Sequence, residues 1–328
     1  MFDSEFVDRA PWWGGDLQTI RNELIRPIEP PMDQGERLEF PTLDGSGDIL
    51  VGMLDTPEIE SEEPLIMLIH GLTGNHDSSY MRASAQFHLE QGRKVLRLNL
   101  RGAGPTQRTC KSHYSAVYAD DIRAVLEGLP EWLRQHGVFA VGYSFGGNIL
   151  INALAKPWAA EHFVGGATVS APLRPVDAAN RLKEPRNHLY QKSLLARMKV
   201  ETLSPCAQLD ADEQSAIHNA QSIYEFDDTF TAPRFGFRDA EDYYLQTGAA
   251  RFVRQLVVPT LLIHARNDPW IPVAMYDDCQ AVGGRNAFFV ITTSGGHVGF
   301  HEQGYTATRH DRAIGGFLSH TASDARFA

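Results

Sequence analysis

Val138-Phe-Ala-Val-Gly-Tyr-Ser-Phe-Gly-Gly-Asn148 is the stretch that decides the fold. Its first four residues form an apolar run that predicts a buried strand, and the residues from Gly147 to Ala155 predict a helix. Between them, Gly142-Tyr-Ser-Phe-Gly146 matches G-x-S-x-G, a sharp strand–turn–helix that holds a serine with its Oγ exposed. We therefore predict that Ser144 is a nucleophile. The alternative is an ordinary glycine-rich turn with a helix-capping serine.

The same alternation of short apolar runs and helical segments extends along most of the chain. Short runs punctuated by Gly and Pro predict buried parallel strands, here at Leu65–Ile69, Val95–Leu100, Val138–Val141, Val164–Val169, Val257–Ile263 and Ala287–Ile291. Crossover helices are predicted at Met81–Gln91, Tyr118–Gln135 and Gly147–Ala155. Alternating strands and helices indicate an α/β fold with a doubly wound, mostly parallel sheet.

The alternation stops between Leu173 and about Ala250, where no buried strand is predicted. Tyr190, Leu194 and Met198 are spaced four apart and would share one helix face, either as a packing stripe or as the lining of an acyl pocket. We predict a core formed by residues 1–172 and 251–328, with residues 173–250 inserted as a helical lid.

A serine hydroxyl needs a base, and the base needs an orienting acid. In sheets of this kind the chain order is serine, acid, histidine. Asp268 follows the strand predicted at 257–263 and is the acid that we predict, although an Asp-Pro turn former is the alternative. His297 lies in a glycine-containing loop after the last strand, so we predict it as the base.

The chain has 13 histidines, so position must separate the base from its rivals. His301 lies further into the following segment, and His264 lies inside or at the end of a strand. His310 and His320 fall in a predicted terminal helix. His297 is the histidine placed directly after the last strand.

Two backbone N–H groups should bind the oxyanion of the tetrahedral intermediate. One belongs to Phe145, the residue after the nucleophile. The other should come from the loop after an earlier strand, where we prefer Leu72, with Thr73 as second choice. His70 in this loop is expected to be a buried structural residue.

Charge and cysteine content limit the function classes. The formal net charge of −11 disfavours nucleic acid as a partner. Three scattered cysteines favour a reducing, cytoplasmic location over a disulfide framework. No signal peptide or transmembrane segment is predicted, and the chemistry requires no cofactor and no metal. We derive no oligomeric state.

These residues resemble the YheT-like (Emb8-like) branch of the α/β-hydrolase superfamily. The resemblance spans nearly the whole chain. It rests on Leu17-Gln-Thr-Ile20, His70-Gly-Leu-Thr-Gly74, Asn99-Leu-Arg-Gly102, the serine motif, Asp228-Thr-Phe-Thr-Ala-Pro233, Gly236-Phe, Asp242-Tyr-Tyr244, Asp268-Pro269 and Gly295-Gly-His-Val-Gly-Phe300. It implies the α/β-hydrolase fold and a serine esterase acting on short- to medium-chain acyl esters or lipid esters. Relatives often carry two aspartates at the acid turn, whereas this chain has Asn267-Asp268.

Other functions remain open at this stage. The same triad could serve an acyltransferase or a thioesterase, and the fold could also form a ligand-binding protein without chemistry. A dinucleotide-binding enzyme is disfavoured because Gln107 occupies the third glycine position after Arg101-Gly-Ala-Gly104. Metal-dependent hydrolysis is disfavoured because the chain has no HExxH motif and no paired cysteines.

Overall fold

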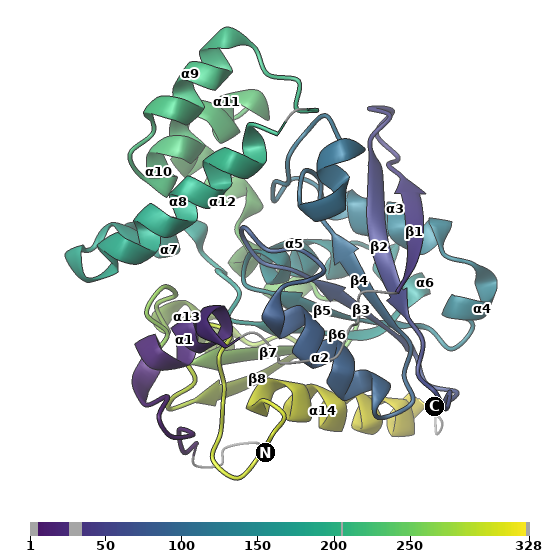
Figure 1. Cartoon of the computed structure of the whole chain (residues 1–328). Helices are drawn as coiled ribbons and strands as arrows, with labels where there is room; N and C mark the ends of the chain where they lie inside the picture. The colour runs from purple at the N-terminus through teal and green to yellow at the C-terminus, as the bar shows by residue number, and fades with distance from the viewer. Residues whose placement is uncertain (1–5, 26–34, 205, 326–328) are drawn as a thin grey trace.

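The computed structural model describes residues 6–25, 35–204 and 206–325. An eight-stranded sheet lies at its centre in the order β1-β2-β4-β3-β5-β6-β7-β8 (Figure 1). The strands are β1 (Glu36–Pro41), β2 (Ile49–Asp55), β3 (Leu65–Ile69), β4 (Val95–Asn99), β5 (Val138–Tyr143), β6 (Phe163–Val169), β7 (Thr260–Ala265) and β8 (Ala287–Thr292).

The sheet is parallel from β4 to β8, whereas β1 and β2 pair antiparallel at one end. The predicted α/β class with a doubly wound, mostly parallel sheet is confirmed, and each of the six predicted runs overlaps one strand. Strands β1 and β2 were not predicted from the sequence. In β1 only Phe40 is buried, so this strand lacks the continuous apolar run of a buried parallel strand.

Helices cover both faces of the sheet (Figure 1). On one face α2 and α14 pack against the strands, and on the other face α3, α5 and α13 do so. The bounds are α1 (Gly14–Leu24), α2 (Ser79–Leu89), α3 (Ala119–Gly128), α4 (Glu131–Arg134), α5 (Phe145–Leu154), α6 (Ala159–His162), α13 (Ala274–Val282) and α14 (Arg309–Ala325).

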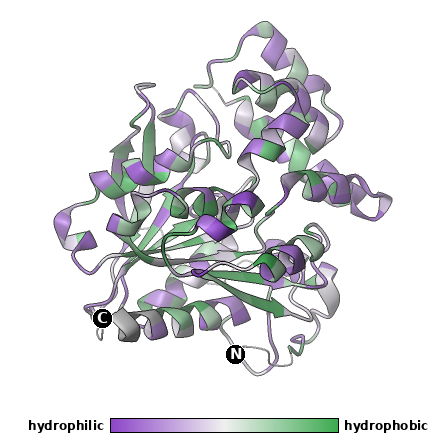
Figure 2. Cartoon of the chain, turned by 180° about the vertical axis from the view of Figure 1, so that it is seen from behind, coloured by the Kyte–Doolittle hydropathy of each residue, from purple (hydrophilic) through white to green (hydrophobic). Residues whose placement is uncertain are grey.

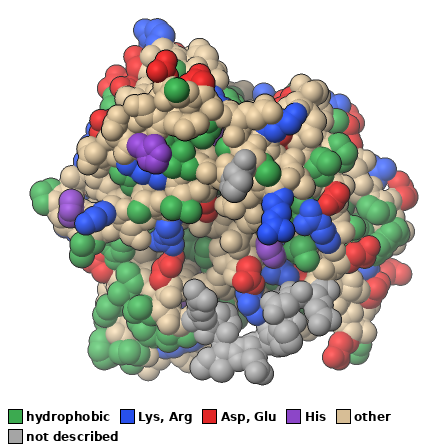
Figure 3. Space-filling model, turned by 45° about the horizontal axis from the view of Figure 1, so that its top comes forward, with side chains coloured by type: hydrophobic (Ala, Val, Ile, Leu, Met, Phe, Trp, Pro, Cys, Tyr) green, Lys and Arg blue, Asp and Glu red, His purple; other side chains and the backbone are tan. Residues whose placement is uncertain are grey.

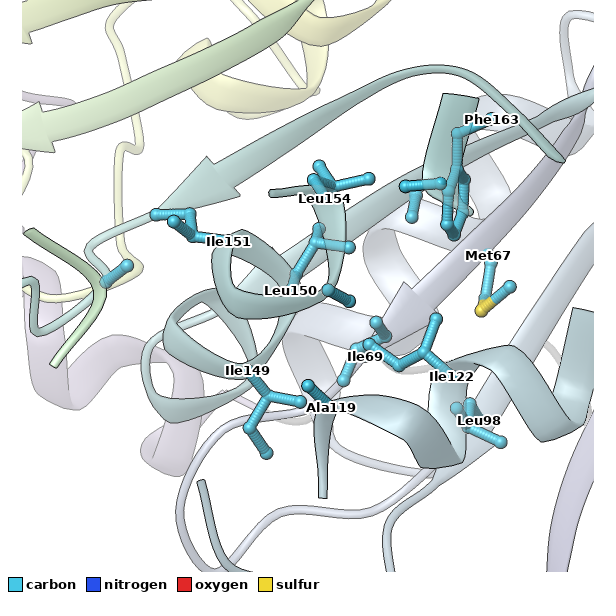
Figure 4. Close-up of a cluster of buried hydrophobic side chains, with 14 of the residues drawn as sticks. Met67, Ile69, Leu98, Ala119, Ile122, Ile149, Leu150, Ile151, Leu154 and Phe163 are labelled. Atoms are coloured by element: carbon cyan, nitrogen blue, oxygen red, sulfur yellow. The ribbon is translucent and has the colours of Figure 1, made fainter. Parts of the chain in front are cut away.

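The core lies between the strands and these helices. Every residue of β3, β4 and β5 is buried, as expected for strands covered on both faces. In Figure 4, side chains of α3 and α5, such as Ile122 and Leu150, gather with Met67 and Phe163 from the sheet. Figure 2 shows hydrophobic strands at the centre, with helices that carry both hydrophilic and hydrophobic residues.

The prediction of a single helix over Tyr118–Gln135 was wrong. The structure has two helices there, α3 and α4, with Pro130 between them. A proline disfavours the helical conformation of the residue before it, and Leu129 is accordingly extended, with φ −67° and ψ 135°. The chain therefore leaves α3 at Gly128 and starts a new short helix after the proline.

Between Leu173 and Ala250 the described residues contain helices and no strand. The helices are α7 (Pro175–Lys183), α8 (His188–Thr202), α9 (Ala211–Asn219), α10 (Ile223–Phe226), α11 (Ala232–Arg234) and α12 (Ala240–Thr247). Tyr190, Leu194 and Met198 pack into one cluster, as their spacing predicted. We call residues 173–250 the helical insertion; its bounds as a separate domain stay a prediction.

A buried arginine ties the end of β4 to the neighbouring elements. The Arg101 guanidinium, only 1% exposed, donates to Asp121 at 2.5 and 2.7 Å and to Asp48 at 3.1 Å. The central guanidinium carbon of Arg101, Cζ, lies 3.8 Å from the centre of the Tyr118 ring. Burial alone would lower the pKa of Arg101, but the Asp121 carboxylate raises it above its usual value. Arg101 therefore stays charged and organises the loop.

We expect Arg101→Met to lower the free energy of unfolding by about 3–5 kcal/mol, because it leaves buried carboxylates without their cation. Arg123→Met, which removes an exposed i,i+4 pair with Glu127, should cost less than about 1 kcal/mol. Urea unfolding of both variants checks this. Equal losses in the two variants would contradict the importance of the buried cluster.

Candidate active site

Ser144 lies between β5 and α5, at the carboxyl end of the central strands. Its backbone has φ 49° and ψ −120°, a region that residues other than glycine seldom adopt. The Ser144 N–H donates to the carbonyl of Val169 at 2.8 Å, which ties the turn to β6. The motif therefore forms the strained strand–turn–helix that its sequence predicted.

Glycines permit the close packing around this turn. A Cβ on Gly142 would lie 2.6 Å from the Gly146 carbonyl oxygen, and a Cβ on Gly146 would lie 2.3 Å from the His70 carbonyl oxygen. A Cβ on Gly71 would lie 3.0 Å from the Ser144 Cβ. The loop after β3 thus runs directly against the serine because no side chains keep them apart.

The three residues predicted as a triad lie together. His297 Nε2 is 2.9 Å from Ser144 Oγ, and His297 Nδ1 is 2.8 Å from Asp268 Oδ2. Ser144 is separated from His297 by 153 positions in the chain, and Asp268 from His297 by 29. Each follows the carboxyl end of its own strand, β5, β7 or β8, and parallel strands bring these ends to one edge.

Asp268 is buried and fully hydrogen-bonded. Its Oδ1 accepts the N–H groups of Trp270 at 2.8 Å and Ile271 at 3.0 Å, while Oδ2 faces His297. Burial alone would raise the pKa of this carboxyl, but His297 and the hydrogen bonds hold it below its usual value. Asp268 therefore remains ionised and keeps the imidazole oriented. The Trp270 ring packs 4.3 Å from the His297 ring, centre to centre.

The rival histidines have structural partners. Burial lowers the pKa of His264 to about 4 and that of His301 to about 2, so both stay neutral. His264 Nε2 faces the Ile271 carbonyl, and His301 Nε2 faces Asn22 Oδ1. His70 is buried, and its Nε2 accepts the Leu100 N–H at 3.1 Å, as expected for a structural residue.

The two backbone groups predicted as oxyanion donors flank the serine. Leu72 follows Gly71 in the loop after β3, and Phe145 begins α5. Neither the Leu72 nor the Phe145 N–H donates a hydrogen bond to another described residue. The Thr73 N–H, our second choice, instead donates to Tyr114 Oη at 2.9 Å. The N–H groups of Leu72 and Phe145 are therefore free to bind an oxyanion, whereas that of Thr73 is not.

Tyr114 links this loop to the helical insertion. The Tyr114 Oη accepts a hydrogen bond from the Thr73 N–H. The same hydroxyl donates to Glu201 Oε2 in α8 at 2.8 Å. Its ring lies 5.7 Å from the Phe145 ring. Burial raises the pKa of Glu201 to about 7. Thr73 itself has φ 57°, so a strained loop residue is held by a buried tyrosine. This link could not be predicted from the sequence, because it joins residues far apart in the chain.

The loop that carries His297 is held by α1 near the start of the chain. Thr19 Oγ1 accepts the His297 N–H at 2.8 Å, and Gln18 Oε1 accepts the His301 N–H at 2.8 Å. Gln18 Nε2 donates to the His301 carbonyl at 3.0 Å, and Asn22 Nδ2 to the Val298 carbonyl at 2.9 Å. The Gln-Thr motif noted in the sequence thus contacts the loop of the predicted base.

Asn267 also supports the His297 loop. Its Oδ1 accepts the Gly296 N–H at 3.0 Å, and its Nδ2 donates to Ser294 Oγ at 2.7 Å. The uncharged residue at this position therefore joins the Asp268 turn to the His297 loop. A carboxylate could accept the first hydrogen bond but could not donate the second.

A cavity of about 690 Å³ opens onto Ser144 and His297. The helical insertion contributes much of its wall, including Leu182, Leu194 and Met198. The stripe on α8 therefore serves both predicted roles, packing and cavity lining. On the face seen in Figure 3, acidic and basic side chains are interspersed among apolar and uncharged ones.

The described residues contain neither a cluster of metal ligands nor a membrane-spanning helix. Within residues 6–25, 35–204 and 206–325, no three His, Cys, Asp or Glu side chains are grouped to hold a metal ion. Over the same part of the chain, no helix has the length and apolar character required to cross a membrane.

Comparison with known proteins places the chain among hydrolases. Residues 64–303 match a family described as alpha/beta hydrolase fold. The chain is 27% identical over 301 residues to the protein named YheT of Escherichia coli (strain K12), covering 90% of this chain and 87% of YheT. It is 28% identical over 300 residues to mouse (Mus musculus) "Phospholipase ABHD3", covering 88% of this chain and 72% of the relative.

Among solved structures, the fold is similar to that of a Pyrococcus furiosus esterase, with a TM-score of 0.59. The match covers 90% of this chain and 96% of that chain at 16% identity, so it concerns the fold alone.

The contact of Thr19 with the His297 loop can be tested by stability. We expect Thr19→Val to lower the free energy of unfolding by about 1–3 kcal/mol, because the buried His297 N–H loses its acceptor. Thr19→Ser keeps the hydroxyl and should stay closer to the wild type. Guanidinium unfolding measures both. A valine variant as stable as the serine variant would contradict the role assigned to this hydrogen bond.

Proposed function

Because the chain belongs to the alpha/beta hydrolase fold family, we propose that it hydrolyses carboxylic esters with Ser144 as the nucleophile. The observation that carries this proposal is the unbroken series of contacts from Asp268 through His297 to Ser144 Oγ, which ends in a cavity. A serine hydroxyl aligned with an imidazole and a buried carboxylate suits acyl transfer.

In the proposed first step, Ser144 Oγ attacks the ester carbonyl carbon while His297 Nε2 takes the serine proton. Asp268 holds the Nδ1–H tautomer and stabilises the imidazolium that forms. When the tetrahedral intermediate collapses, the bond to the alcohol oxygen breaks. The alcohol leaves with the proton from His297, and an acyl-enzyme remains on Ser144.

Hydrolysis of the acyl-enzyme repeats the sequence with water. His297 takes a proton from the water as its oxygen attacks the acyl carbon, and then returns that proton to Ser144 Oγ. The carboxylic acid is released and the serine is restored. No group outside the protein and water is needed to balance this reaction.

The Leu72 and Phe145 N–H groups would bind the oxyanion in both steps. Each such donor contributes about 3–4 kcal/mol of transition-state stabilisation. Phe145 also begins α5, whose N-terminal dipole favours negative charge at this position. Tyr114, which holds Thr73 beside Leu72, acts in this scheme as a positioning residue.

We propose short- to medium-chain acyl esters or lipid esters as the substrate class. A cavity of about 690 Å³ is within the range of pockets that enclose small organic ligands. Its insertion-side wall is largely aliphatic and aromatic, which suits an acyl chain. The names of the relatives, which include a phospholipase, are compatible with this class.

Covalent labelling tests the nucleophile. We expect a fluorophosphonate to label the wild-type protein at one site per chain, and Ser144→Ala to abolish the labelling because it removes the attacking oxygen. Ser215→Ala, a change on the exposed face of α9, should keep full labelling. An unlabelled wild-type protein, or labelling that survives in Ser144→Ala, would overturn the proposal.

The positioning role of Tyr114 predicts a split between binding and turnover. Tyr114→Phe keeps the ring but leaves the Thr73 N–H without its acceptor, so we expect kcat for p-nitrophenyl butyrate to fall about tenfold with KM changed less than about twofold. Tyr118→Phe, which loses only a hydrogen bond to Ser112, serves as the control. A KM effect alone would indicate a role in substrate binding instead.

A further inference from the structure

A carboxylate in the helical insertion faces the cavity without a role in the chemistry proposed above. Asp227 is the first residue of a π-helical turn, Asp227–Thr231, between α10 and α11. The first and last residues of this turn, Asp227 and Thr231, line the cavity. A π-helical turn inside a helix frequently marks a functional site, because its cost must be compensated. The position of this turn on the cavity wall therefore indicates that Asp227 and Thr231 bind a ligand group.

Asp227 differs from the other acidic residues of the cavity wall in having no cation beside it. Asp77 pairs with Arg82 at 3.1 Å, and Glu23 pairs with Arg197 at 3.1 Å. Among the described residues, no Lys, Arg or His lies within 4.0 Å of the Asp227 carboxylate. Its Oδ2 accepts a hydrogen bond from Tyr244 Oη at 2.6 Å.

The surroundings of Asp227 are poorly solvated. Phe226 and Tyr243, which also line the cavity, are almost fully buried. Burial raises the pKa of Asp227 to about 6, although the hydrogen bond from Tyr244 acts in the opposite direction. The Thr231 hydroxyl lies close enough to Asp227 to lower that pKa. It is buried, and no described residue forms a hydrogen bond with it.

A desolvated carboxylate with a single strong hydrogen bond is costly unless another donor reaches it. The cavity is where such a donor can arrive, because Asp227 retains partial exposure and lines this space. We propose that Asp227, with Thr231 beside it, binds a hydrogen-bond-donating group of the substrate, either a hydroxyl or a primary ammonium. This inference rests on the proposed ester hydrolysis and narrows its substrate class.

The substrate would then have two ends with different chemistry. Its ester would lie at Ser144 and its donor group at Asp227, in one cavity whose insertion-side wall is largely apolar. A site built around a buried acceptor discriminates strongly against an analogue that lacks the donor, because the acceptor is then left unpaired. A plain alkyl ester would bind but leave Asp227 unsatisfied.

Matched ester pairs test the inference. Each pair has the same chain length and ends in methyl, hydroxyl or primary ammonium, with the variable end on the acyl side in one series and on the alcohol side in the other. We expect wild-type kcat/KM to favour a donor-bearing ester over its methyl counterpart by about tenfold or more in at least one series. The hydroxyl and ammonium members show which donor is preferred.

Asp227→Asn is the decisive variant. For the ammonium esters, we expect the ratio of kcat/KM to that of the methyl ester to fall to within about twofold of unity. For the hydroxyl esters, we expect the same ratio to decrease at least fivefold. Asp228→Asn alters the adjacent carboxylate, whose Oδ1 accepts the Ala240 N–H and which does not line the cavity, so it should keep the wild-type ratio. Tyr244→Phe leaves the carboxylate in place and should also retain a preference for donors.

Two results would overturn the inference: no donor preference in either wild-type series, or a donor preference of unchanged size in Asp227→Asn. Because the readout is a ratio within one variant, a general loss of folding or activity does not imitate it. Failure of the ester hydrolysis itself would show differently, as no turnover of any ester and no fluorophosphonate labelling of the wild type.

Discussion

The close approach of three backbone segments around Ser144 is the constraint on which the rest of the site depends. The serine is held at φ 49°, its N–H is fixed to β6, and the loop after β3 passes so near that a Cβ on Gly71 would touch it. Such backbone strain persists only where the surrounding structure enforces it. The buried parallel strands β3, β5 and β6 provide that enforcement, and the segments that follow β3 and β5 carry Leu72 and Phe145, the proposed oxyanion donors.

The His297 loop and the loop after β3 are each supported by an element distant in sequence. The His297 loop depends on α1, where Gln18 is fully buried and binds the backbone of His301 in both directions. The loop after β3 depends on Tyr114, which in turn binds Glu201 of the helical insertion. The insertion therefore does more than line the cavity: α8 is connected through two hydrogen bonds to the backbone beside the proposed oxyanion site.

Features that a local sequence pattern marks were predicted correctly, whereas contacts between residues far apart in the chain were not. Ser144, Asp268 and His297 could be recognised because each directly follows a strand, and the topology of a parallel sheet brings strand ends together. The six parallel strands could be recognised because continuous apolar runs mark them, although the run predicted at Val257–Ile263 is offset from β7 (Thr260–Ala265). A local rule was missed at Pro130, which interrupts the helix predicted over Tyr118–Gln135.

The supporting contacts could not be derived in this way. Gln18 and His301 are 283 positions apart, and Tyr114 and Glu201 are 87 apart. Nothing in the local pattern of either segment states its partner. The Gln-Thr motif of α1 was visible as a resemblance, but its contact with the His297 loop needed the three-dimensional arrangement. Likewise Asp227 belongs to an insertion whose helical period predicts packing and says nothing about which carboxylate faces the cavity.

The central claim is that Ser144 Oγ carries the acyl group between two half-reactions. Rapid mixing with excess p-nitrophenyl butyrate, followed by acid quenching and mass spectrometry of peptides, tests it most directly. The predicted result is a butyryl adduct, confined to the peptide that contains Ser144, which forms with a burst of nitrophenol and disappears as the ester is consumed. Turnover of the ester with no adduct on Ser144, or an adduct on another residue that forms and decays at the turnover rate, would contradict it.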